Sequence, residues 1–253
     1  MADAQNYHAA LKTIPNLKKL LILGTTPELR VVASDFVAHP MVADFSLPMI
    51  RATDIMLPRD VVQKEEKLLM GWLDLPSHIE SHSCDAVVGD LVIRQIFSAS
   101  TRVFLKGIHD IVKKGGVFIT RTNIRNEVYR KENAIQIILE AAQKVFLKNA
   151  ADNVYTYMFQ FYDACTDPAS GSLSLGLVRQ SFEEALKSCK DFETEKNIKN
   201  LQKIFGNPTV PWTHLTKKAV EEAAVEFFYI KNVLFSQDYP DATLFPLYVF
   251  EAK

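Results

Sequence analysis

The stretch LKKLLILGTTPELRVVASDFVAHPMVAD, residues 17–44, constrains the fold of this chain most strongly. An apolar run ends in Gly24, and its length suits a buried parallel strand. Pro27 follows at the favoured first position of a helix, where its missing N–H needs no partner. A second apolar run ends in Asp44, twenty residues after the glycine. This order predicts a strand, a helix and a second strand parallel to the first.

Short apolar runs and helical patterns continue to alternate through the first half of the chain. Runs that suit buried strands span residues 17–23, 41–43, 67–73, 85–88 and 117–120. Residues 103–112 carry apolar side chains at helical spacing, and Lys113, Lys114 and Gly115 suit the end of that helix. The repeated alternation predicts a mostly parallel, doubly wound α/β sheet.

The C-terminal part is predicted to hold one helix and then two strands, over residues 216–226, 227–235 and 244–250. The loop between the strands holds Tyr239 and Pro240 and is too short for a parallel crossover, so the strands must pair antiparallel. Pro246 cannot donate to a sheet ladder, which predicts a bulge or a strand start there. The expected fold is therefore a seven-stranded sheet with an antiparallel C-terminal hairpin.

Between these parts the pattern is helical alone, which predicts an insertion after the fifth strand, over residues 125–205, within a single domain of residues 1–253. Apolar stripes run through residues 135–146, 154–165 and 178–189. Aromatic residues crowd one short segment: Tyr155, Tyr157, Phe159, Phe161 and Tyr162. They either pack among the helices or form a lid that brings aromatic walls and phenol hydroxyls to a small molecule.

Charge and composition limit the kinds of partner. Twenty-nine basic and thirty acidic residues nearly cancel, so no net field attracts nucleic acid or anionic lipid. No window approaches the roughly 20 uninterrupted apolar residues that cross a bilayer. The chain begins without an apolar targeting segment, and Cys84, Cys165 and Cys189 have no metal-ligand spacing. These features predict a soluble protein of the reducing cytoplasm without a nucleic-acid or membrane partner.

The ends of the predicted strands carry the candidate binding residues. Thr25 or Thr26 can cap the helix that starts at Pro27, whose free N–H groups would then point at a bound group. Asp44 stands where folds of this kind use a carboxylate to bind ribose hydroxyls, although a solvated loop acid is the alternative. Trp72, at the end of the third run, either lies against a planar base or packs in the core.

The order of ILGTTPELR, VADFSLPMI, WLDLP, CDAVVGD and FLKGIHDIVKKGGVFIT resembles that of the class I, Rossmann-like S-adenosylmethionine-dependent methyltransferases. In particular, it is similar to a bacterial branch in which a Leu-Gly-x-Thr-Pro-Glu-Leu sequence replaces the glycine-rich first loop. The resemblance covers residues 17–122 well and the rest loosely, and the order of the segments carries it. It implies S-adenosylmethionine as the cofactor and methyl transfer as the activity.

The resemblance also implies which residues contact the cofactor. Residues after the first strand would border its methionine part: Gly24, Thr25 and Thr26. Residues after the second strand would line the adenosine, with the carboxylate on the ribose hydroxyls: Asp44, Phe45, Ser46 and Met49. Residues after the third strand would lie near adenine: Gly71, Trp72 and Leu73. Residues at the end of the fourth strand would lie where cofactor and acceptor meet: Gly89, Asp90 and Leu91.

The chain departs from the family pattern at Gly71, where members often have an acid that binds the adenine amine. Adenine recognition would then fall to backbone groups, to Trp72, or to Asp74 in a shifted register. The first loop also lacks the second and third glycines of the usual motif.

No catalytic residue stands out, because methyl transfer from a sulfonium depends first on positioning the acceptor. Several side chains are conceivable bases, and none has a spacing that singles it out: Tyr7, His8, Asp90, His109, Tyr157 and Tyr162. Candidate acceptor contacts are Tyr7, Asn123, Tyr157 and Tyr162. His78 and His82 have no nearby third ligand, so no metal site is predicted. Residues 6–12 suit a short helix, which is either a frayed terminus or an arm over a ligand.

The favoured hypothesis is methyl transfer from S-adenosylmethionine to a small organic acceptor. The alternative is a methyltransferase-like binding or partner protein without turnover, suggested by the sparse glycines and by Gly71. A nucleotide-binding oxidoreductase is disfavoured, because GTTPEL lacks the glycines that let a backbone approach a pyrophosphate.

Overall fold

The computed structural model describes residues 2–146, 154–208, 212–238 and 241–253. The chain divides into two compact units. The sheet unit comprises Met1–Ile124 and Lys217–Lys253, and the helical unit comprises Arg125–Thr216. The loop residues Tyr239 and Pro240 lie outside the described part of the chain.

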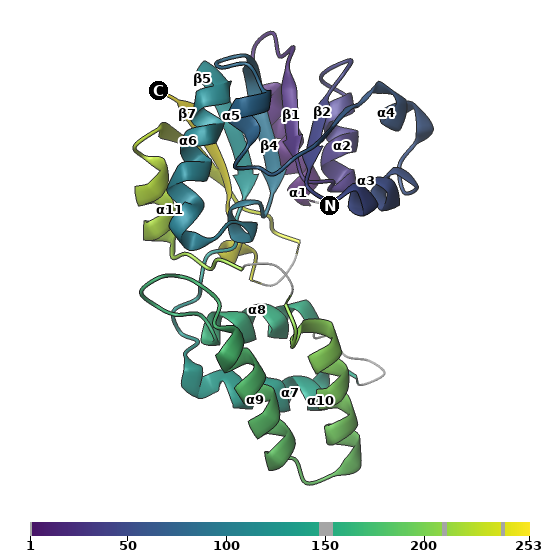
Figure 1. The fold of residues 1–253 in the computed structure, drawn as a ribbon, viewed down its shortest axis with the longest axis vertical. Coiled ribbons are helices and arrows are strands. Elements are labelled where there is room, and N and C mark those ends of the chain that lie inside the picture. Colours follow the sequence, from purple (N-terminus) through teal and green to yellow (C-terminus); the bar gives the residue numbers. More distant parts are fainter. Residues whose placement is uncertain (1, 147–153, 209–211, 239–240) are drawn as a thin grey trace. The chain divides into compact units, whose positions relative to one another are not determined.

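Among the described residues, seven strands form one sheet in the order β3-β2-β1-β4-β5-β7-β6 (Figure 1). They are β1 (Leu20–Leu23), β2 (Met41–Asp44), β3 (Glu66–Leu69), β4 (Cys84–Asp90), β5 (Val112–Arg121), β6 (Phe228–Leu234) and β7 (Leu247–Ala252). β1 to β5 are parallel, and β7 lies antiparallel between β5 and β6. The predicted mixed sheet with its C-terminal hairpin and its helical insertion after the fifth strand is confirmed.

The helices of the sheet unit follow the predicted alternation. They are α1 (Ala2–Lys12), α2 (Pro27–Ser34), α3 (Leu47–Asp54), α4 (Arg59–Lys64), α5 (Leu75–His78), α6 (Thr101–Ile111) and α11 (Lys217–Ala224). Pro27 and Pro48 stand in the first turns of α2 and α3, and the Ser46 hydroxyl caps α3 by accepting from the N–H of Met49 at 3.3 Å. α1 and α2 pack together on an apolar cluster with β1, β4 and β7, and α6 packs with α5 and α11.

Gly115 does not end the crossover helix, so that prediction was wrong. α6 ends at Ile111, and β5 begins at once with Val112, which pairs with Cys84 of β4. The register between the two strands shifts before Ala86, and Gly115 has φ +74°. Glycine reaches this left-handed conformation without a steric penalty, and it serves a bulged strand here.

The third strand is shorter than predicted. β3 ends at Leu69, and a turn in which the N–H of Asp74 donates to the carbonyl of Gly71 at 3.1 Å follows it. Trp72 therefore lies on that turn rather than in the strand. At the C-terminus, β7 begins at Leu247, directly after Pro246, whose carbonyl accepts from the N–H of Thr122 at 3.1 Å. The predicted strand start at this proline is confirmed.

The helical unit has a core of its own. Its described helical elements are a 3₁₀ turn (Lys131–Asn133), α7 (Ala134–Lys144), α8 (Val154–Ala164), α9 (Leu175–Ser188) and α10 (Phe192–Phe205). Phe161, Phe182 and Phe205 are buried and meet with ring centroids 5.3–5.7 Å apart. The apolar stripes predicted for α7, α8 and α9 are present, whereas α10 had no stripe assigned to it. That the two units form a single domain stays a prediction.

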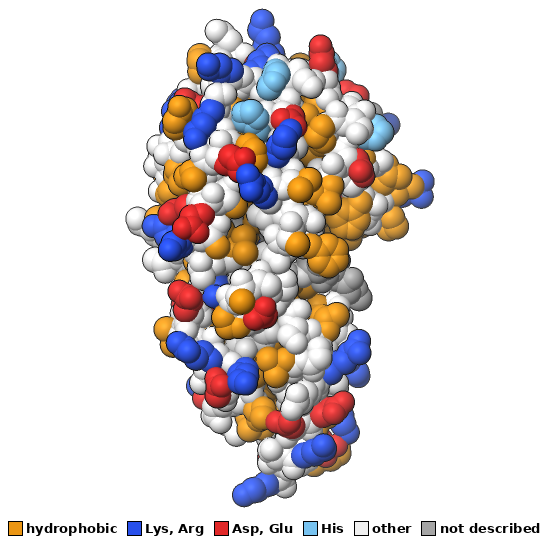
Figure 2. Space-filling view, turned by 60° about the vertical axis from the view of Figure 1, so that its left-hand side comes forward, with side chains coloured by type: hydrophobic (Ala, Val, Ile, Leu, Met, Phe, Trp, Pro, Cys, Tyr) orange, Lys and Arg blue, Asp and Glu red, His pale blue; other side chains and the backbone are white. Residues whose placement is uncertain are grey.

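Surface charge is mixed, as the composition indicates. Figure 2 shows Lys and Arg interspersed with Asp and Glu over the visible face of each unit. None of the helices in the described part of the chain is both long and apolar enough to span a membrane.

Candidate functional site

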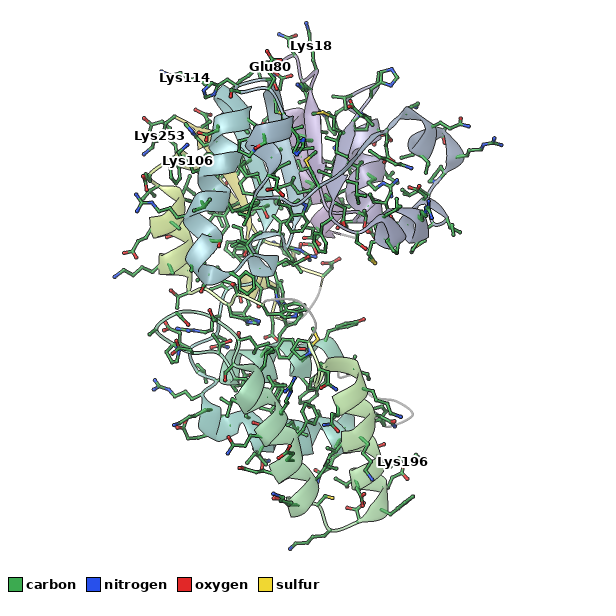
Figure 3. The ribbon with its side chains drawn as sticks, in the orientation of Figure 1. Lys18, Glu80, Lys106, Lys114, Lys196 and Lys253 are labelled. Carbon is green, nitrogen blue, oxygen red and sulfur yellow. The ribbon has the colours of Figure 1, made fainter. Side chains whose placement is uncertain are left out.

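The carboxyl ends of β1, β2 and β4 form one edge of the sheet, because these strands are parallel and adjacent. Gly24 directly follows β1, and Asp44 and Asp90 are the last residues of β2 and β4. The opposite edge, where strands begin, carries solvated charges such as the labelled Lys18, Glu80 and Lys114 (Figure 3). The structure thus brings the sequence-predicted residues of the sheet unit to a single edge, where open α/β folds bind ligands.

Gly24 makes the first turn at this edge. Its φ is +83°, and its N–H donates to the carbonyl of Ala43 at 2.9 Å. The same carbonyl accepts from Nε1 of Trp72 at 3.2 Å, and Trp72 is only 4% exposed. Trp72 is therefore buried beside the ends of β1 and β2, which is the core-packing alternative of the sequence analysis. Its role toward adenine stays a prediction.

Replacing Gly24 by alanine should lower the free energy of unfolding by about 1–2 kcal/mol, because an L-residue is strained at this φ. A Cβ would lie 3.7 Å from Cζ2 of Trp72, an ordinary contact, so the cost is one of backbone conformation. Gly176→Ala in α9 is the matched control, since no atom lies within 4 Å of its Cβ and its φ is not positive. Urea unfolding that gave both variants the same stability would contradict this account.

Asp44 is a buried carboxylate, only 6% exposed. Its Oδ1 accepts from the N–H of Ser46 at 2.7 Å. Burial raises the pKa of Asp44 above its usual value, although the backbone N–H groups of Ser46 and Phe45 act in the opposite direction. Among the described residues, backbone N–H groups are its hydrogen-bond donors. A carboxylate has about four acceptor positions, so Asp44 keeps capacity for hydroxyl donors.

The neighbouring predicted residues differ in exposure. Phe45 and Met49 are 54% and 51% exposed, and the ring of Phe45 meets that of Trp72 edge-on at 5.6 Å. Leu73 is also exposed, whereas Thr25 is buried. Thr26 is the residue before α2, but its hydroxyl makes no capping hydrogen bond, so the cap predicted from its side chain is absent there.

Gly71 lies directly against the side chain of Asp74. A Cβ built at Gly71 would come within 2.7 Å of Oδ2 of Asp74. The carboxylate of Asp74 therefore occupies the space into which a side chain at position 71 would extend. A role of Asp74 toward adenine, one alternative of the sequence analysis, stays a prediction.

The end of β4 is tightly built. A Cβ at Gly89 would lie 2.8 Å from Val92 Cγ1 and 3.2 Å from Leu23 Cβ, so any other residue there would force these side chains to shift. Leu91 has φ +56°, and its N–H donates to the carbonyl of Arg121 at 2.9 Å. Asp90 accepts two hydrogen bonds from Arg121, from Nε at 2.7 Å and from Nη2 at 2.8 Å.

Sequence reasoning did not single out Arg121. The residue ends β5, beside Asp90 in the parallel register, and this pairing is a non-local property. The sequence shows only an arginine at the end of a predicted strand. It does not show the two carboxylate partners, Asp90 and Asp3, because both are distant in the sequence.

α1 places Tyr7 at this edge. The hydroxyl of Tyr7 donates to the carbonyl of Gly89 at 2.8 Å and accepts from the N–H of Arg121 at 2.9 Å. Burial, followed by the negative charge of Asp90, raises the pKa of Tyr7 well above its usual value, so the phenol keeps its proton. The helix is thus packed over the sheet rather than frayed. A cavity of about 120 Å³ lies here, lined by residues of α1, the start of α2, Asp90 and Arg121.

The other candidate acceptor contacts lie elsewhere. Asn123 is buried in the sheet unit, and its Oδ1 has no hydrogen-bond partner among the described residues. Tyr157 and Tyr162 are buried in the helical unit, where the hydroxyl of Tyr162 donates to the carbonyl of Phe205 at 2.8 Å. His109 lies edge-on to the ring of Phe228, 5.8 Å between centroids. Roles for these residues toward an acceptor stay predictions.

The helical unit contains a cavity of about 620 Å³. Arg125, Tyr129, Asp163 and Leu177 are among its lining residues. Asp163 is buried and is held by Nδ1 of His214 at 2.8 Å and by the N–H of Asn126 at 2.9 Å. The volume of this cavity is within the range of small-molecule sites. No group of three or more metal-ligating side chains is found in the part of the chain that the structure describes.

Comparison with known proteins gives a match in structure only. No family model matches the chain, and no curated protein matches its sequence. An S-adenosylmethionine-dependent methyltransferase from Mesorhizobium loti matches with a TM-score of 0.57 and 13% identity, over 99% of this chain and 98% of the other. The N-methyltransferase NodS from Bradyrhizobium japonicum, in complex with S-adenosyl-L-homocysteine, matches with a TM-score of 0.51 and 8% identity, over 98% and 86%.

A Rhodobacter sphaeroides protein described provisionally as a Zn-dependent alcohol dehydrogenase matches with a TM-score of 0.61 and 12% identity, over 98% and 90%. At such identities the likeness concerns the fold and not the activity of each protein. The chain therefore has the Rossmann-like α/β fold that is found among S-adenosylmethionine-dependent methyltransferases.

Proposed function

We propose that the protein binds S-adenosylmethionine at the carboxyl edge of its sheet and transfers the methyl group to a small organic acceptor. The observation that carries the proposal is Asp44, a buried carboxylate at the end of β2 with acceptor positions left for a ribose diol. The fold shared with methyltransferases supports it, and so does the order of motifs in the sequence.

The remaining contacts are proposed from the resemblance, together with the position of each residue at this edge. The exposed ring of Phe45 and the side chain of Met49 would cover adenosine, with Ser46 and Leu73 beside them. Asp74, whose carboxylate fills the space beside Gly71, would accept from the adenine amine. The turn at Gly24, Thr25 and Thr26 would border the methionine part, and Gly89, Asp90 and Leu91 would lie near the reacting carbon.

When bound, S-adenosylmethionine supplies a methyl group on a positively charged sulfur. The task of the protein is then to orient the acceptor and to exclude water, and positioning of this kind supplies on the order of 7 to 11 kcal/mol. The three free cysteines support a reducing cytoplasm as the location of the protein.

Isothermal titration with S-adenosylmethionine and S-adenosylhomocysteine tests the proposal. At about 100 μM protein, both ligands should release or absorb measurable heat. If neither binds, the proposal fails, and NADH binding detected by fluorescence would instead favour an oxidoreductase.

A binding protein without turnover is the second candidate. The observation that favours it is that Asp90 and Tyr7, the polar groups at the end of β4, are both held in hydrogen bonds with Arg121. Binding of S-adenosylmethionine without release of S-adenosylhomocysteine across a broad set of small acceptors would select this alternative.

A further inference from the structure

Arg121 holds together the first turn of the chain and the ends of two strands. Its Nε and Nη2 donate to the carboxylate of Asp90, and its Nη1 donates to Oδ2 of Asp3 in α1. The other oxygen of Asp3 accepts from the hydroxyl of Ser236, a buried residue after β6. Asp3 is therefore held from both sides, although it lies in the first turn of the N-terminal helix.

The cavity beside this cluster has the chemistry of an amino-acid binding site. Arg121 presents a cation to it, and Asp3, Glu28 and Asp90 line it with the opposite charge. Leu29, in the first turn of α2, lines it as well, and Thr26, the residue before that helix, makes no side-chain hydrogen bond to the free N–H groups of the turn. At about 120 Å³ it has room for roughly four water molecules, which suits an amino-acid end and not a nucleoside.

We propose that Arg121 binds the carboxylate of the amino-acid end of S-adenosylmethionine, and that Asp3 is the internal carboxylate which occupies Arg121 before the ligand arrives. The inference depends on the proposed function and adds a regulatory contact to it. Binding exchanges the carboxylate of Asp3 for that of the ligand at Nη1, while Asp90 keeps its hydrogen bonds from Nε and Nη2. No covalent bond is formed or broken in this step. The hydrogen bond from Arg121 to Asp3 is lost, so the first turn of α1 has to move away from Arg121.

When an internal group competes with a ligand, only molecules in which that group has left the site can bind the ligand. The smaller this fraction of molecules, the weaker the apparent affinity. Removing the charge of Asp3 should therefore tighten binding of any ligand that carries the carboxylate. A ligand without that group gains nothing from the change. This difference separates carboxylate exchange from a general loosening of α1.

The experiment compares two probes by isothermal titration on the full chain. S-adenosylhomocysteine carries the amino-acid end, and 5′-methylthioadenosine is a related nucleoside thioether without it. The variants are Asp3→Asn and Ser236→Ala, which removes the second hold on Asp3. Asp60→Asn is the control, because that carboxylate is 74% exposed on α4.

In Asp3→Asn the dissociation constant for S-adenosylhomocysteine should fall on the order of tenfold, with a smaller fall in Ser236→Ala. The constant for 5′-methylthioadenosine should change less than twofold in both variants and in the control. An unchanged or weaker affinity for S-adenosylhomocysteine in both variants, or an equal change for the two probes, overturns the proposed exchange. If neither probe binds wild type or variants, the proposed function fails as well. If the probes bind but ignore Asp3, only the exchange fails.

Discussion

Arg30→Ala is expected to lower the free energy of unfolding by about 3–5 kcal/mol, the largest effect that we expect from replacing one charged residue. Arg30 is fully buried in α2 and donates to Glu65 at 2.8 Å and to Thr53 at 2.8 Å, and it also pairs with Asp54. The side chain of Glu65 is likewise fully buried. Truncation would leave that carboxylate without its cation, and an unpaired buried charge is strongly destabilising.

Urea unfolding of three variants checks this expectation. Lys64→Ala is the control, because its pair with Asp60 spans 3.9 Å between exposed side chains and should contribute less than about 1 kcal/mol. The double variant Arg30→Met, Glu65→Met should regain most of the lost stability, since apolar replacement of a buried pair is often neutral. A loss below about 1 kcal/mol in Arg30→Ala, or no recovery in the double variant, would show that burial of the pair matters less than argued.

Asp44→Asn should weaken S-adenosylhomocysteine binding by about 10- to 100-fold, because hydrogen bonds to a charged group contribute roughly 1.5–3 kcal/mol. Asparagine keeps an oxygen for the N–H of Ser46, so the turn after β2 is retained. The loss should therefore concern the ligand and not the fold, and thermal unfolding of the free variant checks that separation.

The pH dependence gives a second measurement on Asp44. Because burial raises its pKa, the carboxylate gains a proton at a higher pH than an exposed acid as the solution is acidified. Protonation removes charge and acceptor capacity, so wild-type affinity should fall toward low pH, while Asp44→Asn should show less of this dependence. Asp35→Asn, an exposed acid just after α2, is the control. Equal affinity of Asp44→Asn and wild type would remove Asp44 from the ribose role.

Much of the candidate edge was predictable because its signals are local. Pro27 and Ser46 start helices through their own backbone and hydroxyl chemistry, and the apolar runs before Gly24 and Asp44 are short enough for buried parallel strands. Parallel strands place their carboxyl ends side by side. Element order therefore brings Gly24 and Asp44 to one edge, and the pairing of β4 with β1 adds Gly89.

Other features were not predictable, because remote side chains decide them. Gly115 has the residue type of a helix cap, yet pairing of Val112 with Cys84 makes it part of a bulged strand. Trp72 has the same local sequence whether it faces a ligand or the core, and in the structure it is buried, with its Nε1 donating to the carbonyl of Ala43.

The sequence by itself determined the order of strands and helices along the chain, the parallel sheet with its antiparallel end, and the edge that carries the candidate binding residues. Only the tertiary structure decided that Arg30 is buried with Glu65, and that Asp3, Arg121 and Ser236 meet. The physical reason is the distance along the chain over which each interaction acts. Periodicity, caps and turn residues act over a few neighbouring positions, whereas a buried charge finds its partner across segments separated by tens to hundreds of residues.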